Sequence, residues 1–93
     1  MATQIIAVRV TGGETVRHIA HVVWRNDQTG KLGSLSRQGL ADWMLLHPNA
    51  IVFTRNRLRK ISLVKALRVA SASYIYSLQP KDTVDELLLL PRF

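Results

Sequence analysis

The apolar residues of this chain occur in short runs separated by turn residues, a pattern that suits the strands of a small sheet. In residues 5–10 apolar side chains alternate, and the apolar face of this run consists of Ile6, Val8 and Val10. After a Gly-Gly turn, residues 16–25 form a second run that is rich in β-branched and aromatic side chains. One face of this second run bears Val22 and Trp24, and we expect that face to meet the core.

One segment has helical spacing instead. Leu40, Trp43 and Met44 follow one another at i, i+3 and i+4, which predicts a buried stripe along a helix over residues 37–47. Ser36 precedes the segment as a favourable N-cap, and a proline follows it. We expect the stripe to pack against the apolar sheet face that carries the second run's tryptophan.

The remaining segments complete the predicted order of elements. Residues 26–36 are polar and glycine-containing and predict a loop, whereas residues 50–54 and 73–78 predict strands. Residues 57–70 fit either a strand or a helix, and we favour the strand. In that strand one face consists of Ile61, Leu63, Lys65, Leu67 and Val69.

These segments predict a single α+β domain over residues 1–93. We expect a small antiparallel sheet of about five strands with one helix packed on one face, in the order β-β-α-β-β-β. Four consecutive leucines occupy positions 87–90, and burying each of them stabilises the fold by roughly 1.5–3 kcal/mol. We expect this tail to fold back and close the core, and a dimer contact is the alternative.

Charge is distributed unevenly along the chain. Thirteen Lys and Arg residues against six Asp and Glu give a net charge of +7. Residues 43–81 contain no acidic side chain, and their cations are Arg55, Arg57, Arg59, Lys60, Lys65, Arg68 and Lys81. Such a stretch raises the local positive potential and favours polyanions or acidic protein surfaces as partners.

A nucleic-acid contact is the most concrete function that this stretch predicts. Arg55, Arg57 and Arg59 alternate, so in an extended segment they project to one side and suit a phosphate backbone. Tyr74 and Tyr76 share one face of a neighbouring strand and are candidates for stacking on bases. The predicted binding residues are Arg55, Arg57, Arg59, Lys60, Lys65, Arg68, Tyr74 and Tyr76. Two alternatives stay open: the tyrosines belong to the core, and the arginines protect a sheet edge.

Enzymatic chemistry finds little support in the sequence. The chain has no cysteine, which excludes disulfides, thiolate metal sites and cysteine nucleophiles. His18 and His21 are three residues apart and point to opposite faces of a strand, so they cannot chelate one ion together. We expect no catalytic residues, no metal and no cofactor. Without a signal-peptide pattern or a membrane-length apolar run, we expect a cytoplasmic protein without membrane contact.

Several short motifs resemble a known family. They are Ile-x-Ala-Val-Arg at 5–9, His-Ile-x-x-Val-x-Trp at 18–24, a Ser-Arg-led helix containing a Trp, and Asp-x-Leu-Leu-x-Leu-Pro at 85–91. The chain resembles a family of short bacterial and bacteriophage proteins, a domain of unknown function. It departs from that family's pattern at Ser77, where a Thr is usual, and at Glu86, where an Asn is usual. The resemblance implies a fold and a phage-related lineage but no activity.

We therefore expect a non-enzymatic, small basic binding protein that contacts nucleic acid through the segment 55–68. The alternative is a phage-type inhibitor of host defence, similar to anti-CRISPR proteins, that binds an acidic protein surface. In either case we expect the protein to act in the cytoplasm of a bacterial host cell, as a monomer or a homodimer.

Overall fold

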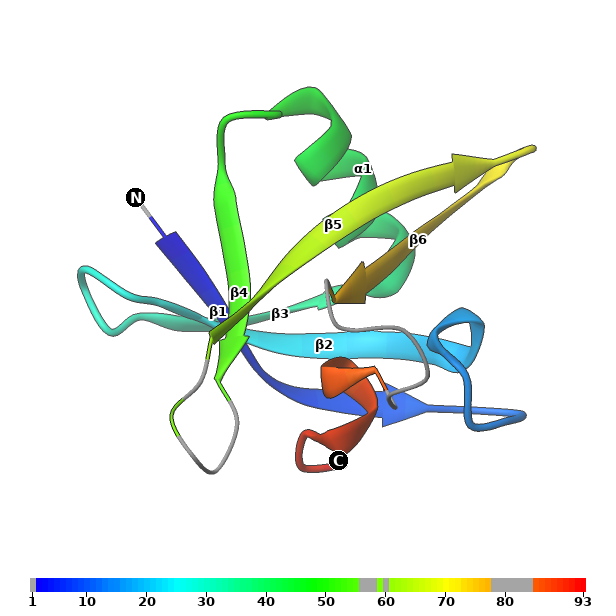
Figure 1. Ribbon diagram of the computed structural model, residues 1–93, viewed down its shortest axis with the longest axis horizontal. Helices are drawn as coiled ribbons and strands as arrows, with labels where there is room; N and C mark the ends of the chain where they lie inside the picture. Colours follow the sequence, from blue (N-terminus) through cyan, green and yellow to red (C-terminus); the bar gives the residue numbers. More distant parts are fainter. Residues whose placement is uncertain (1, 56–58, 60, 78–84) are drawn as a thin grey trace.

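The structure is a computed structural model that describes residues 2–55, 59, 61–77 and 85–93 (Figure 1). The elements are β1 (Ala2–Val10), η1 (a 3₁₀ turn, Val16–His18), β2 (Ile19–Asn26), β3 (Leu32–Ser36), α1 (Arg37–Leu46), β4 (Ile51–Arg55), β5 (Ile61–Val69), β6 (Ala72–Ser77) and η2 (a 3₁₀ turn, Glu86–Leu89). Among the described residues, none of the helices is long and apolar enough to pass through a membrane.

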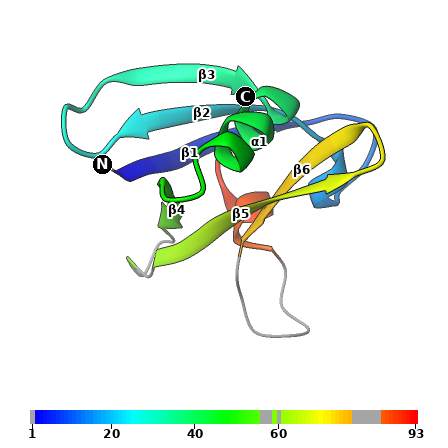
Figure 2. The ribbon, with the colours of Figure 1, turned by 90° about the horizontal axis from the view of Figure 1, so that it is seen from above.

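The strands form one sheet in the order β3-β2-β1-β4-β5-β6. All neighbouring pairs are antiparallel except β1 and β4, which run parallel because α1 carries the chain across the sheet between β3 and β4. The sheet curls around α1, with β1 to β3 on one side of the helix and the β5–β6 hairpin on the other (Figure 2). The α+β class is confirmed, while the sheet has six strands instead of about five and contains one parallel pair.

The additional strand is β3, in the segment for which we predicted a loop. Asn26 turns the chain back, since its Oδ1 accepts hydrogen bonds from the backbone N–H groups of Gln28 (2.9 Å) and Thr29 (3.0 Å). Gly33 lies opposite Trp24, and a Cβ at this position would lie 2.2 Å from Trp24 Cζ2. The glycine that makes this segment resemble a loop therefore makes room for the indole ring.

Two β-bulges change the sides that β1 and β2 present to the core. Ile5 pairs with Trp24 and Ala7 with Val23, so Ile6 is an extra residue in β1. As a result Ile5 and Val8 are both fully buried, and of the predicted face Ile6, Val8 and Val10 only Val8 and Val10 meet the core, whereas Ile6 is replaced there by Ile5. Ala20 is the corresponding extra residue in β2, because Val10 pairs with Ile19 and Arg9 with His21. Ile19 and Val22 are thereby both turned into the core.

Helix α1 begins and ends close to the predicted residues. Ser36 is its N-cap and accepts a hydrogen bond from the backbone N–H of Gly39 at 2.9 Å. Leu40 and Ala41 are its fully buried residues, at 1% and 0% exposure. Trp43 is 39% exposed, so its predicted place in the core is wrong. Leu40 and Ala41 join a core to which β1, β2, β4, β5, β6 and η2 also contribute buried residues.

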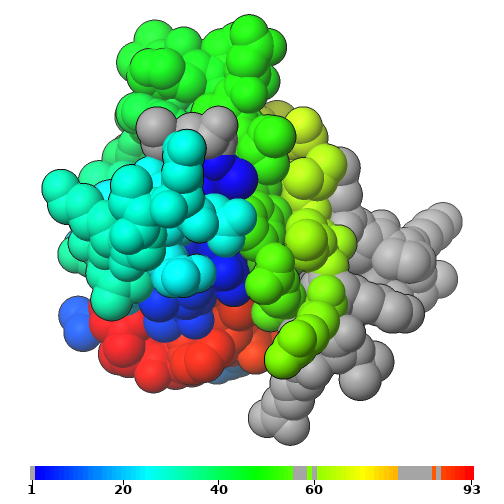
Figure 3. All heavy atoms as spheres, turned by 90° about the vertical axis from the view of Figure 1, so that its left-hand side faces the viewer, coloured from blue at the N-terminus to red at the C-terminus, as the bar shows by residue number. Residues whose placement is uncertain are grey.

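The C-terminal segment folds back onto β1, as predicted. The N–H of Val8 donates to the carbonyl oxygen of Pro91 at 3.0 Å, and the N–H of Phe93 donates to Val8 at 3.3 Å. Figure 3 shows this segment in red against the blue of β1. Leu87 is fully buried, whereas Leu89 is 64% exposed, so the leucine run is only partly inside.

Asp85 fixes the start of this segment to the end of β6. The hydroxyl of Ser77 donates to Asp85 Oδ1 at 2.6 Å, and the N–H of Ser77 donates to Oδ2 at 3.0 Å. The same carboxylate accepts a hydrogen bond from the N–H of Leu87 at 2.9 Å. Ser77 is one of the positions that depart from the resembled pattern, and its hydroxyl still makes this contact.

Candidate functional site

The structure places the residues of the predicted basic segment on different parts of the molecule. Arg55 ends β4 and its guanidinium carbon lies 5.8 Å from the centre of the Phe53 ring. Arg59 is exposed and has a φ of 62°. Arg57 and Lys60 lie outside the described residues, so the alternating arginine row can be followed only at its two ends.

Lys65 and Arg68 lie on opposite faces of β5. Lys65 pairs with Tyr76, and Arg68 pairs with Ser73. Side chains that are directly opposite one another in a sheet share a face, and neighbours along a strand alternate. Arg68 is therefore on the side of α1, where its Nη1 lies 3.9 Å from the carboxylate of Asp42. The structure does not bring these two cations onto one surface.

The face of the hairpin that is turned away from α1 is largely apolar. We call it the outer hairpin face; it consists of Ile61, Leu63, Lys65, Leu67, Val69, Ala72, Tyr74 and Tyr76. The exposed fractions of its β5 aliphatic residues are 56% for Ile61, 42% for Leu63, 50% for Leu67 and 44% for Val69. Arg55 joins this face at the β4 end, because it pairs with Ile61.

Tyr74 and Tyr76 lie on the outer hairpin face and are half-buried. The ring of Tyr74 is contacted by guanidinium groups from two other elements. The guanidinium carbon of Arg37, from α1, lies 4.4 Å from the ring centre, and that of Arg17, from η1, lies 5.9 Å from it. Sequence reasoning missed both arginines, because their meeting at Tyr74 depends on contacts between distant segments.

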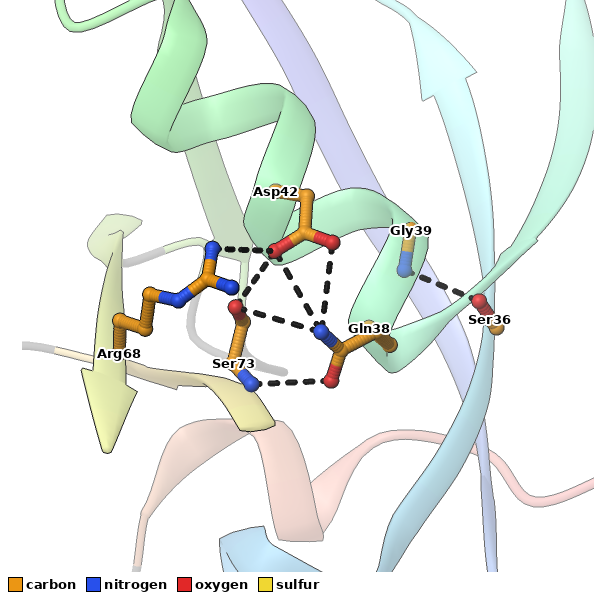
Figure 4. Close-up of polar contacts among 6 residues, drawn as sticks. All are labelled: Ser36, Gln38, Gly39, Asp42, Arg68 and Ser73. Atoms are coloured by element: carbon orange, nitrogen blue, oxygen red, sulfur yellow. Dashed lines mark hydrogen bonds and ion pairs between the residues drawn. The ribbon is translucent and has the colours of Figure 1, made fainter. Parts of the chain in front are cut away.

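The opposite, inner side of the hairpin is held to α1 by a polar network (Figure 4). Ser73 is fully buried and its hydroxyl donates to Asp42 Oδ1 at 2.5 Å. The N–H of Ser73 donates to Gln38 Oε1 at 2.9 Å, and the amide nitrogen of Gln38 donates to Asp42 Oδ2 at 3.3 Å. Asp42 is thereby engaged in joining the helix to the hairpin.

The Ser73 hydrogen bond is the largest cause of a lowered pKa at Asp42. Burial acts in the opposite direction, while the contacts of Gln38 and Arg68 lower this pKa further. A lowered pKa favours the ionised form of Asp42, which is the form that accepts these hydrogen bonds.

The histidines do not form a metal centre within the described part of the chain. Nδ1 of His18 lies 2.7 Å from Thr15 Oγ1 at the start of η1. The ring of His47 stacks on Trp43, with the ring centres 4.8 Å apart. His21 is exposed on β2. Among these residues no group of three potential metal ligands comes together.

Comparisons with protein-family models, with curated proteins and with solved structures give no significant match for this chain. The resemblance of its motifs to a phage-related family therefore stays a prediction. The sequence already placed the aliphatic residues of β5 on one face, and the structure adds that this face is exposed.

Proposed function

We propose that the chain is a non-enzymatic binding protein whose outer hairpin face docks on an acidic, partly apolar surface of another protein. The observation that carries this proposal is the row of exposed aliphatic side chains on one face of β5, at Ile61, Leu63, Leu67 and Val69. Contiguous exposed apolar side chains are typical of interaction surfaces. Protein interfaces combine an apolar centre with a polar rim in which arginine is enriched.

Charge favours an acidic partner over a second copy of the chain. Lys65 lies within the aliphatic row, and Arg55 extends the same face. The whole chain carries a net charge of +7. Two such faces pressed together would bring like charges into contact, which is destabilising, whereas acidic side chains of a partner would pair with these cations.

The same geometry is less suited to nucleic acid. Phosphate contacts need cations that are presented together, and here Lys65 and Arg68 lie on opposite faces. Base stacking needs an open aromatic ring, and Arg37 already lies 4.4 Å from the centre of the Tyr74 ring. Aliphatic side chains offer neither phosphate contacts nor stacking. A phage-type inhibitor of a host defence enzyme is one kind of protein that would use a face binding acidic protein surfaces.

The test compares capture from bacterial lysate with direct binding to nucleic acid. Tagged wild-type protein is incubated with lysate, with and without nuclease, and an Arg55→Gln/Lys65→Gln variant is treated in the same way. We expect a specific acidic protein to be retained after nuclease treatment and to be lost with the variant. An Arg25→Gln/Lys31→Gln variant is the matched control, because these exposed cations lie at the β2–β3 end of the sheet.

The opposite outcome is equally measurable. If capture disappears with nuclease and the purified protein binds random duplex or single strands at low salt, the partner is nucleic acid. Binding should then weaken with salt, with a logarithmic slope of about −0.9 per neutralised phosphate on duplex DNA. Replacing Arg55, Arg57 and Arg59 by Gln should lower the magnitude of that slope by about two to three units. This result would overturn the protein-binding proposal.

A further inference from the structure

A hollow lies where η1 meets the outer hairpin face. Its volume is about 270 Å³, and its walls include Val16, Leu67, Val69, Tyr74 and Tyr76, with Arg17 among them. An apolar cavity of about 150 Å³ accommodates a benzene molecule. The hollow is therefore large enough for one aromatic or long aliphatic side chain.

The two arginines at Tyr74 place positive charge beside this hollow. Neither Arg17 nor Arg37 forms an ion pair with a residue that the structure describes. Nε of Arg37 is buried and has no hydrogen-bond partner among those residues. Two guanidinium groups that share one aromatic ring repel each other, so an anion bound near them is favoured.

The carboxylates closest in sequence to these arginines are already engaged. Glu14 precedes η1 but pairs with Nη2 of Arg92 at 3.2 Å. Asp42 follows Arg37 in α1 but accepts the hydrogen bond of Ser73. Neither of these two carboxylates therefore pairs with Arg17 or Arg37, and a partner can supply an anionic group there.

We infer that this hollow is the anchor point of the proposed protein interface. It receives one aromatic or long aliphatic side chain of the partner, and a carboxylate next to that side chain pairs with Arg17. The inference rests on the proposed function and adds to it the sequence character of the bound segment: an apolar residue adjacent to Asp or Glu. Interfaces often concentrate their binding energy in one such buried apolar anchor.

The experiment uses a minimal probe, so it does not depend on knowing the partner. N-acetyl-phenylalanyl-aspartyl amide is titrated into the ¹⁵N-labelled full chain, and backbone amide shifts are followed by NMR. We expect saturable shifts that concentrate at Arg17, Leu67 and Tyr74. The alanyl-aspartyl analogue should bind at least about tenfold more weakly, because it lacks the buried ring.

Two comparisons test the charge. The phenylalanyl-asparaginyl analogue should bind roughly two- to fivefold more weakly than the aspartyl probe, the range expected for an exposed ion pair. The Arg17→Gln variant should bind the aspartyl probe more weakly by a similar factor. Arg9→Gln is the matched control, because Arg9 is exposed and lies over the Phe93 ring, away from the hollow. This variant should bind the probe like the wild type.

Two results would overturn the inference. One is the absence of saturable shifts at Arg17, Leu67 and Tyr74 up to the solubility limit of the probe. The other is tighter binding of thymidine 5′-monophosphate, which also presents a ring next to an anion and would assign the hollow to nucleic acid. Loss of partner binding in variants of Ile61 and Leu63, which lie outside the hollow, tests the proposed function separately.

Discussion

The hydroxyl of Ser73 donates a 2.5 Å hydrogen bond to the carboxylate of Asp42, across 31 positions of sequence. This contact joins the inner side of the β5–β6 hairpin to α1. The alternation of side chains along β5 and β6 then determines that Lys65, Leu67 and Tyr74 face away from the helix. The exposed outer hairpin face is thus a consequence of how the inner face is fixed.

Replacing Ser73 by Ala should destabilise the fold by about 1–2 kcal/mol, because the hydroxyl is fully buried and its hydrogen bond is made to a charged group. Urea denaturation followed by circular dichroism measures this change. Ser34→Ala is the control, because Ser34 is exposed on β3, and its effect should stay within about 0.5 kcal/mol. Equal effects of the two substitutions would contradict the role given to Ser73.

The same network predicts a pH dependence of stability. The pKa of Asp42 is lower in the folded chain than its ordinary value of 3.8, so ionised Asp42 stabilises the fold above that pH. This contribution is lost as the pH falls through the lower, folded-state pKa. The difference in unfolding free energy between the wild type and Asp42→Asn should therefore be largest near neutral pH and shrink in acid. A difference that stays constant from neutral pH into the acid range would show that the charge plays no part.

Neighbouring positions in α1 should differ sharply in their effect on stability. Leu40 is buried, and Leu40→Ala should cost about 2–5 kcal/mol. Trp43 is 39% exposed, so Trp43→Ala should cost less than the 3–5 kcal/mol typical of a core aromatic residue. Thermal or urea unfolding compares the two variants. If Trp43→Ala lowered stability more than Leu40→Ala, the core position predicted for Trp43 from helical spacing would be correct after all.

The C-terminal leucines provide a second matched pair. Leu87→Ala should destabilise by about 2–5 kcal/mol, because Leu87 is fully buried. Leu89 is 64% exposed, and Leu89→Ala should change stability by no more than about 0.5 kcal/mol. Sizing chromatography of both variants tests the dimer alternative. A dimer that is lost with Leu89→Ala while stability is unchanged would make this segment an interface.

Local signals in the sequence account for the elements that were predicted correctly. The Ser36 cap and the proline that follows the helix mark the limits of α1, and the alternation of residues 61–69 favours the strand found there. Helical spacing, however, shows which residues form a buried stripe but not which of them lies at its most buried point. The stripe is centred on Leu40 and Ala41, which leaves Trp43 at its margin.

Features that depend on distant partners could not be predicted. The bulges at Ile6 and Ala20 exist only in the pairing of β1 with β2, and they turn Ile5 and Ile19 into the core, which simple alternation did not predict. Gly33 pairs with Trp24 across β2 and β3, where the absence of a Cβ leaves room for the indole ring. In the same way, the meeting of Arg17 and Arg37 at Tyr74 requires three separate segments, so no sequence pattern marks it.

The central claim is that the outer hairpin face binds an acidic protein surface, and the affinity of the purified chain for its captured partner tests it most directly. Isothermal titration compares the wild type with Ile61→Ser/Leu63→Ser and with Leu45→Ser/Leu46→Ser. The second variant is the control, because Leu45 and Leu46 are also exposed, at 43% and 78%, but belong to α1. We expect the hairpin variant to bind at least about tenfold more weakly and the control to bind like the wild type. Unchanged affinity of the hairpin variant, or loss of affinity in the helix variant alone, would contradict the claim.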